Sequence, residues 1–136
     1  MKYFLIAGEP SGDIHGASLI EEIRKADHNS DFMYCGGDQM AKQGGTIIKH
    51  YREMAFMGIL PVILNLKKIQ KNFKQCKEKI RLFKPDVLIL IDYPGFNLKM
   101  AEFAKKVGIK TIYYISPKVW AWNTGRVKKI KAYIDE

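Results

Sequence analysis

The sequence predicts a single α/β domain in which helices cover both faces of a parallel sheet. Short apolar segments typical of strands alternate along the chain with longer segments of helical periodicity. Two of the strand segments, 87–91 and 111–115, show no polar alternation, as expected of strands buried on both faces. With 136 residues, 47% of them hydrophobic, the chain is long enough to bury one such core. We therefore expect a Rossmann-like open sheet.

The predicted strands and helices follow one another in a regular order. Each strand is a short apolar run, whereas each helix carries apolar residues at steps of three and four. Gly108, which follows one predicted helix directly, is a typical C-terminal cap. In chain order we predict strand 3–7, helix 13–25, strand 32–35, short helix 39–43, strand 46–48, long helix 59–83, strand 87–91, helix 96–107, strand 110–115 and helix 125–134.

The long helix 59–83 combines a core-facing stripe with a second, basic face. Its apolar residues recur at alternating steps of three and four and predict one stripe packed on the core: Ile59, Val62, Leu66, Ile69, Phe73, Cys76, Ile80 and Phe83. At about 100° per residue, Leu60 and Leu64 point away from this stripe, onto the face that also carries Lys67, Lys71 and Lys74. An apolar tip is thus followed by a basic shaft.

An apolar tip beside a row of lysines suits an anionic membrane surface, because apolar side chains enter the headgroup boundary while lysines attract acidic lipid. We expect the following residues to contact a membrane or an acyl chain: Phe56, Met57, Leu60, Ile63, Leu64, Lys67 and Lys71. The alternative is a solvated lysine face whose apolar start contacts another part of the protein. Nucleic acid is a poor partner for the net charge of +9, because the chain has no motif that combines basic and aromatic residues.

The sequence argues against several other kinds of site. Cys35 and Cys76 lack the spacing of a metal site or of a disulfide framework, so we expect two buried thiols and no metal. The three histidines share no ligand spacing. The chain passes from Met1 and Lys2 directly into a strand, and no apolar run approaches the roughly 20 residues of a membrane-spanning helix. We expect a cytoplasmic protein without a cofactor.

The first predicted strand leads into the loop Gly8-Glu9-Pro10-Ser11-Gly12-Asp13 and then into a helix. Such a loop lies at the edge where the strands of a parallel sheet end, facing the ligand crevice. It is neither a G-x-G-x-x-G fingerprint nor a Walker loop. Its two acids stand beside the positive end of a helix dipole, which suits the binding of hydroxyls or a proton better than a phosphate. We expect substrate contacts from Gly8, Glu9, Ser11 and Gly12, although Ser11 or Asp13 could simply cap the helix.

Two further segments follow predicted strands on the same side of the sheet. In the first, Asp92 could orient or deprotonate a hydroxyl and Asn97 could hydrogen-bond one, unless Asn97 is only a helix-start residue. In the second, Trp120 and Trp122 offer flat faces for a sugar ring or an acyl chain, unless they are packing anchors. We add Ser116 and, as an anion contact, Arg126 to the candidate substrate-binding residues.

Five segments together resemble one known family. They are Ala7-Gly8-Glu9-Pro10-Ser11-Gly12-Asp13, Met57-Gly58, Lys84-Pro85-Asp86, Asp92-Tyr93-Pro94-Gly95-Phe96-Asn97 and Ser116-Pro117-Lys118-Val119-Trp120-Ala121-Trp122. In this order they resemble the lipid-A-disaccharide synthases, from residue 3 to at least Arg126. The combination is much more specific than any one of its motifs.

The resemblance implies an inverting hexosyltransferase of the GT-B type, which acts in lipid A and lipopolysaccharide synthesis. Such an enzyme transfers 2,3-diacylglucosamine from UDP-2,3-diacylglucosamine to 2,3-diacylglucosamine 1-phosphate (lipid X), which forms a β-1,6 disaccharide 1-phosphate and UDP. The resemblance also implies a cytoplasmic protein peripherally associated with the inner membrane. Residues 1–136 would be its N-terminal, acceptor-side domain, inactive without a C-terminal domain that binds the UDP-sugar.

Inverting transfer needs a base that deprotonates the acceptor's 6-hydroxyl. Asp13 is our first candidate, His15 could titrate near neutral pH, and Asp92 is the third. Many members of the family have Asp-Ala-Pro-Asp-Phe-Asn where this chain has Asp92-Tyr93-Pro94-Gly95-Phe96-Asn97, so Gly95 replaces an acid whose duty cannot be transferred here. Two alternatives stay open: a nucleotide-binding module of another enzyme, and a non-catalytic basic domain for membrane surfaces.

Overall fold

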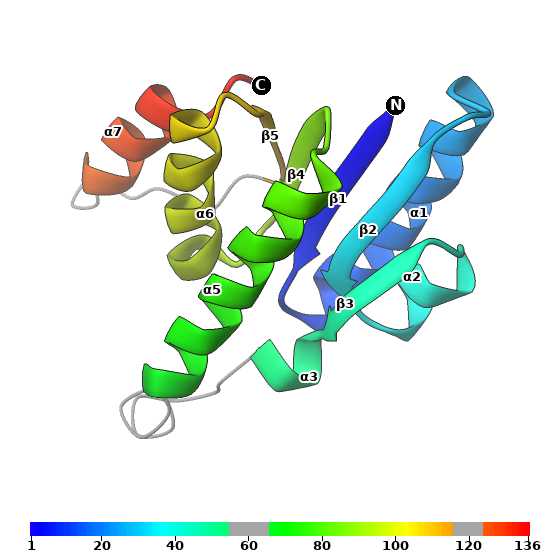
Figure 1. Ribbon diagram of the computed structural model, residues 1–136, viewed down its shortest axis with the longest axis horizontal. Helices are drawn as coiled ribbons and strands as arrows, with labels where there is room; N and C mark the ends of the chain where they lie inside the picture. Colours follow the sequence, from blue (N-terminus) through cyan, green and yellow to red (C-terminus); the bar gives the residue numbers. More distant parts are fainter. Residues whose placement is uncertain (55–65, 116–123) are drawn as a thin grey trace.

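The computed structural model describes residues 1–54, 66–115 and 124–136, and shows a five-stranded sheet between two helical layers (Figure 1). The strands are β1 (Lys2–Ala7), β2 (Asp31–Gly36), β3 (Thr46–His50), β4 (Val87–Ile91) and β5 (Lys110–Tyr114). The helices are α1 (Pro10–Ala26), α2 (Asp38–Lys42), α3 (Tyr51–Met54), α5 (Leu66–Phe83), α6 (Pro94–Lys106) and α7 (Thr124–Tyr133). The predicted Rossmann-like α/β architecture is confirmed.

The sheet is parallel throughout, with the strand order β3-β2-β1-β4-β5. The chain first builds outward from β1 to β3 and then returns to the other side of β1, where β4 pairs with it in register from Tyr3 opposite Val87 to Ala7 opposite Ile91. The order therefore changes direction between β1 and β4. In open sheets of this kind, the ligand crevice lies at such a switch point, outside the edge where the strands end. We call this the carboxyl edge.

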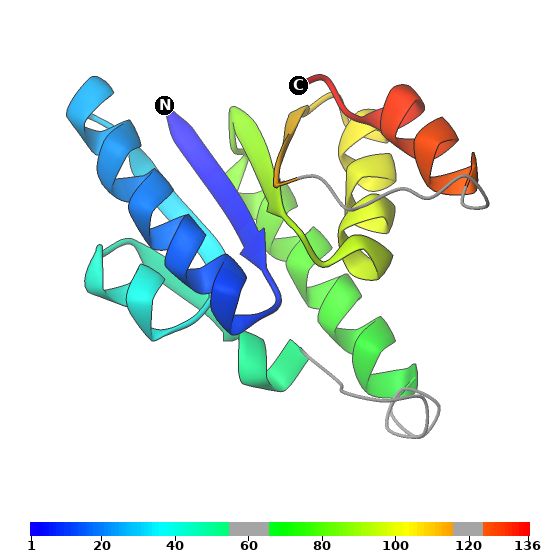
Figure 2. The ribbon, with the colours of Figure 1, turned by 180° about the vertical axis from the view of Figure 1, so that it is seen from behind.

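Alternating side chains divide the core into two clusters, one on each face of the sheet. From β1, Phe4 and Ile6 pack with residues of α5, α6 and α7, whereas Leu5 and Ala7 pack with residues of α1 and α2. All five residues of β4 are buried, as its unbroken apolar sequence predicts. Figure 2 shows α1 and α2 on the face opposite α5, α6 and α7. Because helices cover both faces of the sheet, we expect the functional side chains in the polar loops at the strand ends.

The core-facing stripe of the long helix is confirmed over most of α5. Cys76 and Ile80 are fully buried, and Phe73 packs against the same cluster. Leu66, which we expected in the stripe, is instead 52% exposed because it lies at the first turn of the described helix, beyond the sheet-facing cluster. The first part of the predicted helix, residues 59–65, lies outside the described residues.

Two polar or reactive groups on α5 are buried against the sheet. The Sγ atoms of Cys76 and Cys35 lie 3.2 Å apart as free thiols, and this contact together with burial raises the pKa of Cys35. Asn72 is buried although the stripe did not include it. Its Oδ1 accepts a hydrogen bond from Lys49 Nζ at 2.7 Å, and its Nδ2 donates to the Glu53 carbonyl at 3.1 Å. These bonds attach α5 to the end of β3 and to α3.

Most differences between prediction and structure are at the ends of elements. Two helices begin earlier than predicted, α1 at Pro10 and α6 at Pro94, because proline fits the first turn of a helix, where its missing N–H costs nothing. The sequence analysis missed α3, whose four residues are too few to show a period. Among the described residues, no helix is both long and apolar enough to cross a membrane.

Replacing Ile80 by Ala tests whether α5 is anchored through its buried stripe. Ile80 is fully buried, so Ile80→Ala removes packed methylene groups and leaves a cavity. We expect the free energy of unfolding to fall by about 2–5 kcal/mol in urea denaturation. Leu82→Ala is the matched control on the same helix, because Leu82 is 78% exposed, and it should change stability by less than about 0.5 kcal/mol. Equal effects of the two substitutions would contradict this packing.

Candidate functional site

The loops after β1 and β4 pack against each other at the switch point. Gly8 lies against the ring of Tyr93, so closely that a Cβ at Gly8 would stand 2.4 Å from Tyr93 Cδ1. The ring is held by stacking on Phe96, at 5.6 Å between centroids, and by a hydrogen bond of 2.8 Å from the Tyr93 hydroxyl to the Met54 carbonyl. Burial, followed by the Glu9 carboxylate, raises the pKa of Tyr93. The predicted meeting of the first loop with the Asp92 segment is therefore seen.

Asp13 is buried and bonded to the start of α2. Its Oδ1 accepts hydrogen bonds from the backbone N–H groups of Gly37 at 2.8 Å and Met40 at 3.0 Å, and its Oδ2 accepts one from Gln39 at 3.0 Å. The side chain is 3% exposed. Asp13 thus caps a different helix from the one we considered in the sequence. A carboxylate whose two oxygens already hold three donors is poorly placed to take a proton from a substrate, so these contacts favour a structural role.

Asp92 has a tightly held backbone and a half-buried side chain. Its N–H donates to the Ile115 carbonyl at 3.2 Å, and its own carbonyl accepts bonds from Asn97 Nδ2 at 2.7 Å and the Tyr113 hydroxyl at 2.6 Å. Both Asp92 and Tyr93 have left-handed backbone angles, with φ of 45° and 51°, which is costly for residues other than glycine. The Asp92 carboxylate has no hydrogen-bond or ion-pair partner within residues 1–54, 66–115 and 124–136. Strain of this kind is typical of functional sites.

Asn97 joins the carboxyl ends of β1 and β4. It is fully buried, and its Nδ2 donates to the carbonyls of Ile6 at 3.4 Å, Ile91 at 3.3 Å and Asp92 at 2.7 Å. It is not the helix-start residue that we had considered, because the N-cap of α6 is Tyr93. Its Oδ1 is buried and has no partner in the part of the chain that the structure describes. The amide therefore positions the strand ends.

Tyr113 at the end of β5 was not predicted as part of the site. Burial, then the charge of Asp92, raises the pKa of this phenol, while a hydrogen bond with Asn97 and the Arg126 guanidinium act to lower it. The Tyr113 hydroxyl is thus the point where the influences of Asp92, Asn97 and Arg126 meet, although these residues come from different elements. The available signal was a tyrosine near the end of the strand that follows the Asp92 segment in the sequence.

The remaining predicted residues of the first loop differ in exposure. Gly8 and Gly12 are buried, whereas Glu9, Ser11 and His15 are exposed. Glu9 is the N-cap of α1 without a side-chain capping bond, and a Cβ at Gly12 would lie 3.2 Å from that of Ala7, so glycine lets α1 begin close to β1. On α5, Lys67 and Lys71 are exposed. The following predicted residues lie outside the described part of the chain: Phe56, Met57, Leu60, Ile63, Leu64, Ser116, Trp120 and Trp122.

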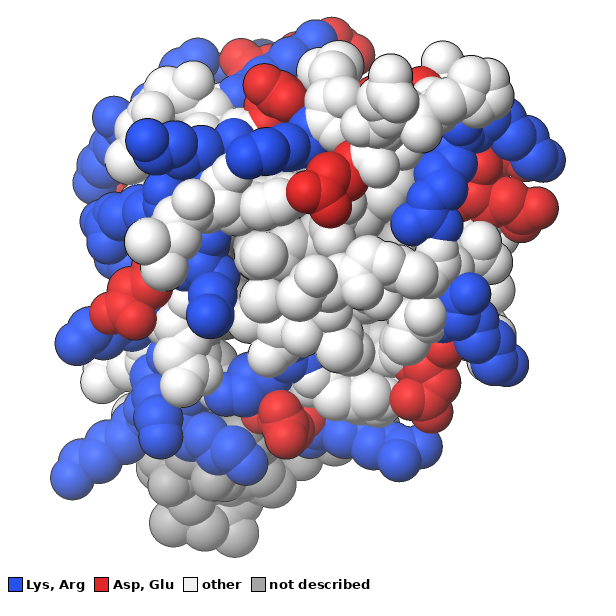
Figure 3. Space-filling view, turned by 45° about the vertical axis from the view of Figure 1, so that its right-hand side comes forward, with Lys and Arg blue, Asp and Glu red and all other residues white. Residues whose placement is uncertain are grey.

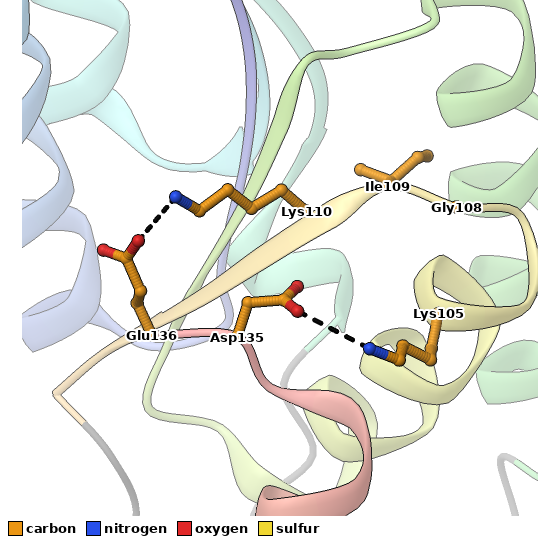
Figure 4. A pocket seen from close by; sticks show the side chains of 6 residues that line it. All are labelled: Lys105, Gly108, Ile109, Lys110, Asp135 and Glu136. Carbon is orange, nitrogen blue, oxygen red and sulfur yellow. Dashed lines mark hydrogen bonds and ion pairs between the residues drawn. The ribbon is translucent and has the colours of Figure 1, made fainter.

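Two hollows of about 540 Å³ lie at different ends of the molecule. One is an apolar groove between α5 and α6, beside the β4–α6 turn. The other involves Lys110, the first residue of β5, so it lies at the edge opposite the strand-end loops. Figure 4 shows its charged side chains paired with each other, Lys110 with Glu136 and Lys105 with Asp135 at 3.6 Å. The first hollow, not the second, is lined by Tyr93 and Gly95, which belong to the turn after Asp92 and to the start of α6.

Within the described part of the chain, no group of three or more His, Cys, Asp or Glu side chains is placed to hold an ion. What the carboxyl edge offers instead is a carboxylate without a partner, exposed hydroxyl and acid groups on the first loop, and a guanidinium near Tyr113. This set can bind hydroxyl groups and accept a proton.

Comparison with known proteins gives a consistent family match. The Lipid-A-disaccharide synthetase family matches residues 3–136. The chain is 43% identical over 134 residues to the lipid-A-disaccharide synthase of Trichlorobacter lovleyi, and 42% identical over 131 residues to that of Coxiella burnetii. These alignments cover 98% and 96% of this chain but 35% of each relative. The chain therefore spans about a third of the length of the curated relatives it matches.

Solved structures of low sequence identity share the fold. A crystal structure of UDP-GlcNAc 2-epimerase from Neisseria meningitidis bound to UDP-GlcNAc has a TM-score of 0.62 at 16% identity, and the match covers 92% of this chain and 34% of that chain. A crystal structure of the glycotransferase of kitacinnamycin has a TM-score of 0.61 at 14% identity, covering 96% and 34%. At these identities the likeness concerns the fold alone.

The structural role of Asp13 can be tested by stability. Asp13→Ala leaves three backbone N–H groups at the start of α2 without their acceptor, and each buried unsatisfied donor costs about 1–3 kcal/mol. We expect the free energy of unfolding to fall by about 3 kcal/mol or more. The control is Ser11→Ala, on the exposed side of the same helix, which should have an effect below about 0.5 kcal/mol. An unchanged stability of Asp13→Ala would return Asp13 to the catalytic candidates.

Proposed function

The chain belongs to the lipid-A-disaccharide synthetase family, and from this premise we propose that it forms the N-terminal, acceptor-side domain of an inverting glycosyltransferase. The whole enzyme would transfer 2,3-diacylglucosamine from UDP-2,3-diacylglucosamine to lipid X. The observation that carries the proposal is the position of Asp92 at the switch point of the sheet: its carboxylate has no partner among the described residues, and its turn is held through the Asp92 carbonyl. This is the place where an acceptor hydroxyl would meet a base.

In the proposed reaction, the Asp92 carboxylate accepts the proton of the acceptor's 6-hydroxyl while that oxygen attacks the anomeric carbon. The bond from this carbon to the UDP oxygen breaks, and UDP leaves. Asp92 replaces Asp13 as our first candidate because the oxygens of Asp13 are occupied by backbone N–H groups. A base that is held by its backbone and leaves its carboxylate free is already oriented for the transfer. His15, which is exposed near the start of α1, is our second candidate.

The first loop and α7 would supply the surrounding substrate contacts. Glu9 and Ser11 are exposed at the carboxyl edge, where they could bind sugar hydroxyls, and Gly8 and Gly12 let the backbone approach closely. Arg126, in the first turn of α7, is the candidate contact for an anionic group of the substrate. The rest of the UDP-sugar contacts would come from a C-terminal domain, within the length of the relatives that this chain does not span.

A membrane surface is the partner that best fits the distribution of charge. The three helices α5, α6 and α7 carry fourteen Lys and Arg against two Glu, whereas the rest of the chain has nine basic and twelve acidic residues. Basic side chains gather beside the lower end of α5 in Figure 3. We infer that this helical layer faces the anionic cytoplasmic side of the inner membrane, where both lipid substrates would be held. Attraction of roughly 1 kcal/mol per nearby Lys or Arg would suffice for peripheral association.

The base is tested by transfer assays in the full-length protein that carries this chain. Asp92→Asn keeps the size of the side chain but removes its basicity, so kcat should fall by about 10²–10⁴-fold while KM for lipid X changes little. Asp31→Asn is the control, because Asp31 is exposed at the start of β2, at the opposite edge of the sheet. A normal kcat in Asp92→Asn, with loss of activity in His15→Gln, would assign the base to His15. No transfer by the unmodified protein would overturn the proposed function.

Membrane association is tested by sedimentation of the chain with vesicles. We expect binding to vesicles that contain phosphatidylglycerol, weaker binding at high salt and none to pure phosphatidylcholine. The double substitution Lys67→Glu/Lys71→Glu should weaken binding by about thirtyfold or more, since each lost lysine removes about 1 kcal/mol. The control is Lys25→Glu/Lys42→Glu, which makes the same charge change on α1 and α2. Equal weakening by both pairs would show that net charge, not this face, determines binding.

A further inference from the structure

We propose that the apolar groove between α5 and α6 binds one acyl chain of the lipid substrate, beside the turn that carries Asp92. The inference rests on the proposed function and names where its substrate's chain would lie. Leu66, Ile69 and Phe73 line the groove from α5, and Tyr93 and Phe96 line it from the β4–α6 turn and α6. Its volume of about 540 Å³ lies within the roughly 300–1,000 Å³ typical of small-molecule sites.

The floor of the groove is aromatic and firmly held. The rings of Phe73 and Phe96 meet edge to face at 5.5 Å, and Tyr93 stacks on Phe96 and is fixed by its hydrogen bond to the Met54 carbonyl. Next to this floor, Leu66 is 52% exposed although it continues the apolar stripe of α5. A rigid aromatic floor with an exposed aliphatic wall favours a flexible hydrocarbon chain, because binding hides apolar surface without rearranging the protein.

Gly95 lies at the mouth of the groove, next to the turn that carries Asp92. It is the second residue of α6, it is exposed, and a Cβ added there would meet no atom within 4 Å among the described residues. Its backbone is not in the left-handed region, so a larger side chain would fit without strain. Because Tyr93, the direct neighbour of Asp92, lines the groove, a chain that enters at Gly95 would have its polar head near the turn that carries the proposed base. Glycine at this position thereby determines whether a chain can enter.

Charge around the groove selects an anionic amphiphile. Lys99 lies one helical turn after Gly95 and lines the groove, and a neighbouring hollow that is also lined by Phe73 and Lys99 includes Lys77 and Arg81. The Nζ atom of Lys77 stands 5.0 Å from the centre of the Phe73 ring, so cations border the aromatic floor itself. A chain attached to a sugar phosphate matches both the apolar floor and the basic rim. The position next to Asp92 favours the substrate over a bulk membrane lipid.

Photolabelling of the 136-residue chain tests the groove directly. The probe is 2,3-diacylglucosamine 1-phosphate with a diazirine near the end of one acyl chain, presented in phosphatidylcholine nanodiscs, and labelled peptides are identified by mass spectrometry. We expect labelling of α5 and α6 in the wild type. Gly95→Phe fills the mouth and should lower this labelling by about tenfold, as expected if it excludes roughly two methylene groups. The matched control is Gly125→Phe, because Gly125 is likewise the second residue of its helix with free space for a Cβ, and it should label normally.

Three outcomes would overturn the proposal that the groove binds an acyl chain of the substrate. These are labelling confined to other elements, equal labelling of Gly95→Phe and Gly125→Phe, and equally strong groove labelling by a diazirine phosphatidylglycerol, which would identify a membrane lipid as the occupant. Circular dichroism of both variants shows whether they fold. The transfer assay of the full-length protein separates the two proposals. If transfer occurs but the groove is not labelled, only the groove is wrong, whereas absent transfer contradicts the proposed function itself.

Discussion

The amide of Asn97 connects β1 and β4, the two strands between which the strand order of the sheet reverses. Its buried Nδ2 group donates hydrogen bonds to carbonyls at the carboxyl ends of β1 and β4 and to the Asp92 carbonyl. The Tyr113 hydroxyl of β5 donates to the same Asp92 carbonyl. Buried carbonyls at strand ends need donors, because an unpaired backbone group away from water is costly. This hydrogen-bond network holds Asp92 and Tyr93 in their left-handed backbone conformation. The position of the site therefore depends on one buried amide group.

The rigid turn has two consequences for the site. Its polar side presents the Asp92 carboxylate at the carboxyl edge, and its apolar side presents Tyr93 and Phe96 to the groove along α5. Proton transfer and acyl-chain binding would thus be positioned by one short segment. The basic layer formed by α5, α6 and α7 lies on the same face of the sheet, so a lipid held at a membrane could reach both. Under the proposed function, this geometry would connect membrane binding with proton transfer without a large movement of the chain.

Sequence patterns predicted the elements well because their physical causes are local. An unbroken apolar run predicted β4 to the residue, and steps of three and four predicted the buried face of α5 around Cys76 and Ile80. The starts of α1 and α6 at proline were predicted three and two residues late, although proline in a first helical turn is itself a local signal. The four-residue α3 and the burial of Asn72 were missed, since a polar residue gains its partners only when distant segments pack.

The sequence by itself determined the fold class, the family and the fact that the loops after β1 and β4 share one edge of the sheet. Periodicity and motif order are properties of neighbouring residues, so they survive without coordinates. Only the tertiary structure decided which of the two acids, Asp13 or Asp92, has its carboxylate oxygens occupied by hydrogen bonds. Asp13 meets the N–H groups of Gly37, Gln39 and Met40 only because α2 packs beside α1, whereas the Asp92 carboxylate meets no partner among the residues that the structure describes and its turn is held through its backbone. Hydrogen bonds between segments distant in sequence distinguish two carboxylates that the sequence treats alike.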